Sequence, residues 1–351
     1  MKRNTYKVFA SRLWNSLDKV APQVWIVVIA LLAYYQIAFL QNSLKWDMII
    51  GYLPRRYFIG ECLQNGIFPL WNPFGQAGYP LYANLISVWS PEILLPAFIS
   101  GYTNLTLHLF FMLHIILAGI GMYHLQLYLV KNRRAALLIG IAYMLSGFFI
   151  GNAQHANFLT GGAWLPFVLL FYFKLFDAPS KVSFAALLVV LFLMVTGGYP
   201  ALSIILAYVL AALFVYLVTG LLMRQKYRQA FQWTGINLGV AAIIGLLSLG
   251  QIYALQEVTP YINRFAELSP DKILTNSFTL RAMLSLLFPY ATVSNGDFWG
   301  TDISMANGYL GLFMLLFFLA GIFNTKNQRA RFFMATGLVS LLAALGEALP
   351  V

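Results

Sequence analysis

Three side chains near the start of this 351-residue sequence have types and spacing that could do chemistry: Asp47, Arg55 and Arg56. Asp47 follows the first long apolar run and stands beside Trp46. A carboxylate at a membrane surface among aromatic side chains is partly desolvated, which raises its pKa and suits it to act as a base. Arg55 lies eight residues further on, so a helix between them would put both on one face, although Pro54 interrupts such a helix.

Histidines offer a second set of candidates. His155, in "GNAQHAN", falls in a short turn that we expect on the same side of the membrane as Asp47. His108, His114 and His124 lie within one apolar run, six and ten residues apart, which is not the spacing of a ligand pair on one helical face. We therefore expect these three to make packing or polar contacts.

The remaining acids and the single cysteine predict less. We expect Glu61 and Glu92 to be ordinary loop acids. Asp297 and Asp302 flank Gly300, and either bind a cation or belong to a solvated loop. Cys62 is the only cysteine, so an intrachain disulfide is excluded, and no metal-ligand spacing is present.

The elements that must position these residues are membrane helices. The composition is 60% hydrophobic and only 9% charged, with a mean hydropathy of +0.75, whereas soluble domains carry roughly 25% charged residues. Continuous apolar runs without alternation favour helices over barrel strands. The sequence predicts an all-α polytopic membrane protein, one module over 1–351, with about nine spans: 22–41, 103–129, 135–152, 158–176, 182–197, 200–222, 231–256, 306–323 and 332–349.

The distribution of basic residues predicts the orientation. With a cytoplasmic N-terminus, 16 of the 22 lysines and arginines fall on the inner side, as the positive-inside rule expects. Basic turns beside anionic headgroups also explain the net charge of +11, so nucleic acid is not an expected partner. We expect a multi-pass protein of the cytoplasmic (inner) membrane, with the lipid bilayer as its partner.

Two long outer segments remain, over about 42–101 and about 257–304, and long loops often carry function. In the first, "PLWNP" and "GQAGYP" impose turns, and "VWSPEILLP" is typical of a short interfacial or re-entrant helix.

Several motifs together resemble the bacterial YfhO-like membrane proteins, a family of polytopic glycosyltransferases with the GT-C fold. They are the aspartate after the first span, then "YLPRRYF", "NGIFPLWNPFGQAGYPLYAN", "SPEILLP", "GNAQHANFLTGGAWLPFVLL", "TGGYPALS", "GQIYALQEVTPYINRFAELS" and "NGYLGLF". The resemblance covers nearly the whole chain. Members of that family are longer, so we expect this chain to be the N-terminal part of a longer protein.

The resemblance implies an enzyme that transfers a sugar, with inversion, from a polyprenyl-phosphate-linked donor to a lipid or wall polymer on the outer face. Asp47 would be the catalytic base or would help to hold a divalent cation, Mg²⁺ or Mn²⁺, and the sequence does not decide between these roles. The leaving phosphate needs positive charge, which arginine supplies well. The candidates are Arg55, Arg56 and Arg264, with Arg281 as a further one.

The expected substrate pocket contains His155, Trp71, Asn72 and Tyr79. Tryptophan stacks on sugar rings, but interfacial tryptophans also form the aromatic belt of any membrane protein. Likewise, arginines at this position can extend to lipid phosphates instead of a substrate.

Two other classes of function stay open. A transporter or flippase for a lipid-linked substrate usually has charged or broken helices at the bilayer midplane, and the predicted spans carry almost no charge there. A non-catalytic membrane component would bind a partner or lipid through the outer loops.

Overall fold

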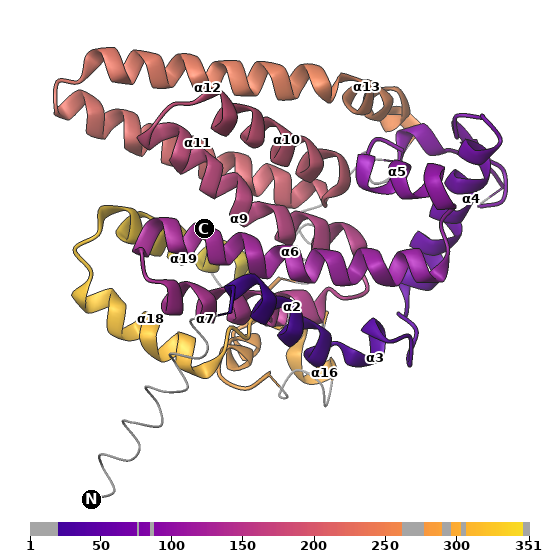
Figure 1. Ribbon diagram of the computed structural model, residues 1–351, viewed down its shortest axis with the longest axis horizontal. Coiled ribbons are helices and arrows are strands. Elements are labelled where there is room, and N and C mark those ends of the chain that lie inside the picture. Colours follow the sequence, from indigo (N-terminus) through magenta and orange to yellow (C-terminus); the bar gives the residue numbers. More distant parts are fainter. Residues whose placement is uncertain are drawn as a thin grey trace, which may run out of the picture.

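The computed structural model describes residues 20–75, 77–84, 88–261, 277–289, 296–302 and 307–346. Within them the chain is almost entirely helical (Figure 1). The strands of this described part are β1 (Trp71–Asn72) and β2 (Tyr79–Pro80), which pair in an antiparallel hairpin. The prediction of an all-α protein is confirmed at this level.

Five helical segments are long and apolar enough to cross a membrane: α6 (Asn104–Val130), Arg133–Gly151, α9 (Ala156–Asp177), α11 (Pro200–Met223) and α12 (Tyr227–Leu247). The second of these consists of α7 (Arg133–Met144) and α8 (Gly147–Gly151). Shorter apolar helices are α2 (Pro22–Ala33), α5 (Pro91–Ser100), α10 (Lys181–Gly197) and α18 (Leu312–Asn324). Five of the nine predicted spans are thus matched by helices long enough to cross a membrane. The predicted total of nine spans is not confirmed.

The other described elements are shorter or more polar. They are α3 (Tyr35–Ala38), η1 (Met48–Tyr52), α4 (Leu53–Gln64), η2 (Leu81–Ala83), α13 (Leu249–Val258), η3 (Thr259–Tyr261), η4 (Arg281–Leu286), α16 (Gly296–Trp299) and α19 (Gln328–Ala344).

Helix breaks explain where predicted spans and observed helices differ. The predicted span 22–41 is divided at Tyr34, which ends α2 in a non-helical conformation. The predicted span 231–256 is divided at Ser248, and the following α13 packs against η2. Gly250 permits this packing, because a Cβ there would lie 2.6 Å from the ring of Trp89.

The bundle is built around α6 and α9. Helix α6 packs against α2, α7 and α9, and α9 packs against α10. Gly119 and Gly140 let α6 and α7 approach closely, since a Cβ on Gly140 would lie 2.7 Å from the carbonyl oxygen of Gly119. The most apolar windows of α6 and α9 are 56% and 67% buried, against 17% and 11% for α11 and α12. The apolar outer surfaces of α11 and α12 therefore suit contact with lipid tails.

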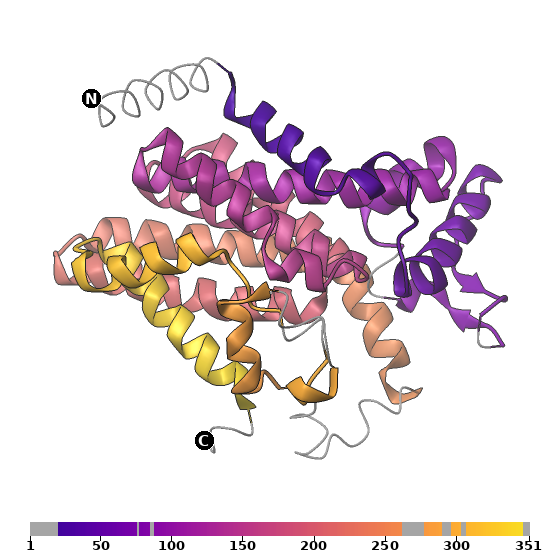
Figure 2. The same cartoon turned by 90° about the horizontal axis from the view of Figure 1, so that it is seen from below.

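The helices have two chemically different ends. At one end, here called the hairpin end, α4, α5 and the β1–β2 hairpin gather (Figures 1 and 2, right). At the other, here called the basic end, the turns after α6, α9 and α11 meet the start of α19. The basic end brings together Lys131, Lys174, Asp177, Arg224 and Arg329. Residues with candidate chemistry from the first outer segment all lie at the hairpin end.

Candidate functional site

Asp47 and His155 come together, although 108 positions separate them in the chain. The Nδ1 atom of His155 lies 3.2 Å from Oδ2 of Asp47. The other ring nitrogen, Nε2, lies 3.2 Å from the side-chain nitrogen of Gln154. A neutral imidazole protonated on Nδ1 satisfies both contacts, because it donates to the carboxylate and accepts from the amide. The pair thus fixes the position of the Asp47 carboxylate.

Short irregular segments place this pair. Trp46 has a left-handed backbone, with φ of 54°, which is unfavourable for a bulky residue and here turns the chain sharply before Asp47. Asp47 then begins the π-helical turn η1. His155 is the N-cap residue of α9 and follows the short helix α8. The Asp47 side chain is 61% exposed and that of His155 is 24% exposed. The expected desolvation of Asp47 is therefore wrong, because Trp46 points outward, 69% exposed, and does not cover it.

The pair lies in the wall of a cavity of about 1330 Å³. The cavity lies between the chain after α3, the turn between α8 and α9, and the segment 300–302 of the second outer loop. Lys45, Gln154 and Asp302 line it together with Asp47 and His155. Sequence reasoning treated Lys45 only as an outer-side charge, and Asp302 either as a cation ligand or as an acid of a solvated loop. Lys45 stands two residues before Asp47. A positive charge so close in sequence to the candidate acid was the signal that could have identified Lys45.

Both arginines lie around one tyrosine near this cavity. Tyr52 is buried and donates a hydrogen bond to Asn157 at the start of α9. Burial raises the pKa of Tyr52, the positive charges of Arg56 and Arg55 oppose that rise, and the negative charge of Asp47 adds to it. Asp47 and both arginines are thus close enough to share one electrostatic environment, as the sequence suggested.

Arg56 does not face the cavity. It is 2% exposed, and its guanidinium lies 4.3 Å from the ring centroid of Phe110 and 5.3 Å from those of Tyr52 and Tyr102. Its Nη1 donates to the hydroxyl of Tyr102 over 2.6 Å. A guanidinium held among aromatic rings is stabilised by cation–π contacts. In this conformation Arg56 connects α4 to α6.

Arg55 belongs to the hairpin instead. Its Nε donates to the hydroxyl of Tyr79 over 3.1 Å, and the amide of Asn72 donates to the same oxygen over 3.2 Å. Trp71 is 54% exposed, and its ring covers Gly78, where a Cβ would lie 2.7 Å away. The structure therefore joins Arg55, Asn72, Trp71 and Tyr79 in one group, and none of these four is among the described residues that line the Asp47 cavity. Arg264 lies outside the described residues.

Glu92 differs from the expected loop acid. Its side chain is only 14% exposed, and its Oε1 accepts from Nε1 of Trp164 over 3.1 Å and contacts Nε2 of His114 at 3.2 Å. His114 is ten residues from the start of α6, about 15 Å along the helix. Glu92, in the first turn of α5, thus packs against α6 and α9 and close to Gly197, the last residue of α10, where an added Cβ would lie 3.3 Å from Oε2 of Glu92. The expectation that His114 makes polar contacts is met by this pair.

The described residues contain no group of three or more His, Cys, Asp or Glu side chains that could hold a metal ion. Asp47 and Asp302 share the cavity without forming such a group. Mg²⁺ is often held by one or two carboxylates together with substrate phosphates, so the cavity is compatible with a cation that arrives with its substrate.

No protein-family model, curated protein or solved structure matches this chain. The resemblance to YfhO-like proteins therefore stays a prediction that rests on sequence motifs.

Proposed function

We propose that this protein is a membrane glycosyltransferase of the GT-C type, which transfers a sugar from a polyprenyl-phosphate-linked donor to a cell-envelope acceptor at the outer face. The hairpin end would be the outer end, and the basic end would face the cytoplasm, in accord with the positive-inside rule. The observation that carries the proposal is the Asp47–His155 pair in the wall of a large cavity that also contains Lys45.

The residues of the cavity can be given roles in an inverting transfer. Asp47 takes the proton of the acceptor hydroxyl as the new bond to the anomeric carbon forms and the bond to the donor phosphate breaks. His155 fixes the carboxylate. Lys45, in the lining of the same cavity, supplies positive charge for the leaving phosphate, a role for which the sequence analysis named arginines. Arg55, hydrogen-bonded to Tyr79, is the second candidate for this phosphate contact.

A product search tests the proposal. The purified full-length protein is incubated with polyprenyl-phosphate-linked sugars and with native lipids and wall polymers, and mass spectrometry detects any acceptor that has gained a sugar mass. The proposal predicts a new glycan and release of polyprenyl phosphate in equal amounts. Donor hydrolysis without a glycosylated acceptor, or no turnover of any donor, would contradict it.

One observation favours a second candidate, a transporter or flippase for a lipid-linked substrate. The predicted spans carry almost no charge, but the structure places Glu92 against His114, a buried residue of α6. Ionisable residues within membrane helices are a feature of transport pathways. Labelled lipid-linked sugar in sealed vesicles separates the two functions: a transporter moves the label across the membrane chemically unchanged, whereas a transferase transfers it to an acceptor. Silence in both assays with a co-purifying protein would support the non-catalytic alternative.

A further inference from the structure

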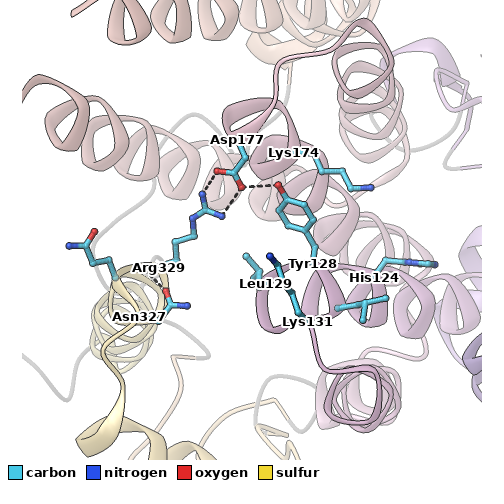
Figure 3. Close-up of a pocket in the computed structure, with 10 residues that line it drawn as sticks. His124, Tyr128, Leu129, Lys131, Lys174, Asp177, Asn327 and Arg329 are labelled. Atoms are coloured by element: carbon cyan, nitrogen blue, oxygen red, sulfur yellow. Dashed lines mark hydrogen bonds and ion pairs between the residues drawn. The ribbon is translucent and has the colours of Figure 1, made fainter. Parts of the chain in front are cut away.

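A second large cavity lies at the basic end, remote from the candidate site. It measures about 890 Å³ and is formed where the last turns of α6 and α9 meet the start of α19 (Figure 3). Its charged lining consists of Lys131, Lys174, Arg329 and Asp177. Its size is within the range of small-molecule sites.

Asp177, the one carboxylate among the described residues of the lining, is already engaged. Asp177 forms an ion pair with both terminal nitrogens of Arg329, and its Oδ2 also accepts from the hydroxyl of Tyr128 over 2.7 Å (Figure 3). Arg329 is in turn held over the ring of Phe173, 4.7 Å from its centroid. These contacts fix the acid and the arginine at one side of the cavity.

The two lysines keep their charge available. Among the residues that the structure describes, neither Lys131 nor Lys174 forms an ion pair. Lys174 lies 5.5 Å from the ring centroid of Phe171, a contact that leaves its ammonium group free to bind an anion. Among the described lining residues, the Arg329–Asp177 pair is neutral and the two lysines leave an excess of positive charge, which favours an anionic ligand.

The backbone at Lys131 supports a role beyond folding. Lys131 ends α6 in the left-handed conformation, with φ of 56°. Glycine normally occupies this position, because a side chain there is strained. The sequence keeps a lysine at a strained turn that opens onto the cavity, and such outliers often mark functional positions.

We propose that this cavity binds a phosphate group, with Lys131 and Lys174 as its main ligands and Arg329 as the third cation. The two possible sources are the headgroup of an anionic membrane lipid and free phosphate. A basic pocket between helices at the cytoplasmic face is the typical site for anionic lipid headgroups. Asn327 already caps the first N–H groups of α19, so binding rests on the side chains and not on the end of that helix.

The test uses the full chain in uncharged detergent and two probes, phosphatidylglycerol and inorganic phosphate. Native mass spectrometry counts bound phosphatidylglycerol, with phosphatidylcholine as the zwitterionic reference of zero net charge, and equilibrium dialysis measures phosphate. The variant is Lys131→Gly with Lys174→Ala. The matched control is Lys226→Ala with Arg228→Ala, which removes two exposed positive charges from another basic turn, outside the cavity lining.

We expect one tightly held phosphatidylglycerol whose affinity falls at least tenfold in the Lys131/Lys174 variant and less than twofold in the control. Glycine at position 131 relieves the left-handed strain, so the apparent Tm of Lys131→Gly alone should equal or exceed that of the parent, which separates lost binding from lost folding. Phosphate binding with the same variant dependence would assign the site to free phosphate. Equal losses in variant and control, or no binding of either probe, would overturn the proposal.

Discussion

The buried Glu92–His114–Trp164 cluster should make a measurable contribution to stability. His114 is fully buried, and its Nδ1 lies 2.7 Å from the carbonyl oxygen of Phe110 while its Nε2 lies 3.2 Å from Glu92. Both neighbours of the ring are acceptors, whereas a neutral imidazole carries only one N–H. The His114 ring is therefore held between two oxygen atoms, the backbone carbonyl of Phe110 and the carboxylate of Glu92.

Replacing Glu92 by alanine removes the partner of two buried groups, the indole N–H of Trp164 and Nε2 of His114. Leaving a buried donor unsatisfied costs about 1–3 kcal/mol, and more where charge is involved. The two losses share one site and are not additive. We therefore expect Glu92→Ala to lower the free energy of unfolding by about 3 kcal/mol in total. Glu92→Gln keeps an amide oxygen for Trp164 but removes the carboxylate beside Nε2 of His114, so a loss of about 1–2 kcal/mol in the free energy of unfolding is expected.

The assay is thermal unfolding of the purified variants in one detergent, followed by intrinsic tryptophan fluorescence. The order of apparent Tm should be wild type, then Glu92→Gln, then Glu92→Ala, with a drop of roughly 5 °C or more for alanine. Glu61→Ala is the control, since Glu61 is an exposed acid of the same end and its loss should shift stability by less than about 0.5 kcal/mol. If Glu92→Ala and Glu61→Ala unfold at the same temperature, the cluster does not stabilise the bundle.

Three further substitutions have expected outcomes. Gly147→Ala should lower the free energy of unfolding by about 1–3 kcal/mol, because an added Cβ would overlap the Asn307 side chain and lie 2.5 Å from the backbone carbonyl oxygen of Asn307. Thermal unfolding measures this loss, and an unchanged Tm would contradict the close contact between Gly147 and Asn307. Arg56→Lys should lower the free energy of unfolding by about 2 kcal/mol, since lysine cannot stack on the aromatic rings as the planar guanidinium does and loses the geometry of the hydrogen bond to Tyr102. An unchanged Tm in the same assay would contradict the stabilising role of these ring contacts. Asn132→Ala removes the N-cap of α7 and should lower the free energy of unfolding by about 1 kcal/mol. Asn132→Ser keeps a capping oxygen and should lower it much less.

Continuous apolar runs predicted several of the helices well. The expected spans 103–129, 158–176 and 200–222 agree with α6, α9 and α11 to within two residues at each end. It failed at Tyr34 and Ser248, because the hydropathy of an apolar run is the same whether or not a helix breaks within it. Just after the break at Ser248, Gly250 packs against Trp89, more than 150 residues earlier, a contact that the local sequence does not indicate.

The candidate site was predicted in part. Residue type and position identified Asp47 and His155, and the structure joins them. The cation beside them is Lys45, because Arg56 is enclosed by aromatic rings and Arg55 is hydrogen-bonded to the hairpin. The directions of the side chains decide which cation faces the cavity, and the spacing of residues on either side of Pro54 does not predict these directions. The burial of Glu92 was likewise not predictable, since it depends on how α5 packs against α6 and α9.

The most direct test of the proposed chemistry is the turnover of lipid-linked sugar by Asp47→Asn in the full-length protein. Asparagine keeps the shape of the side chain and can still bond to His155, but it cannot accept a proton. A base contributes typically 10²–10⁴-fold to rate, so the account predicts a fall in kcat of at least about 100-fold, with normal folding and an unaffected Glu61→Gln control. Undiminished turnover by Asp47→Asn at normal protein level would contradict the role given to Asp47.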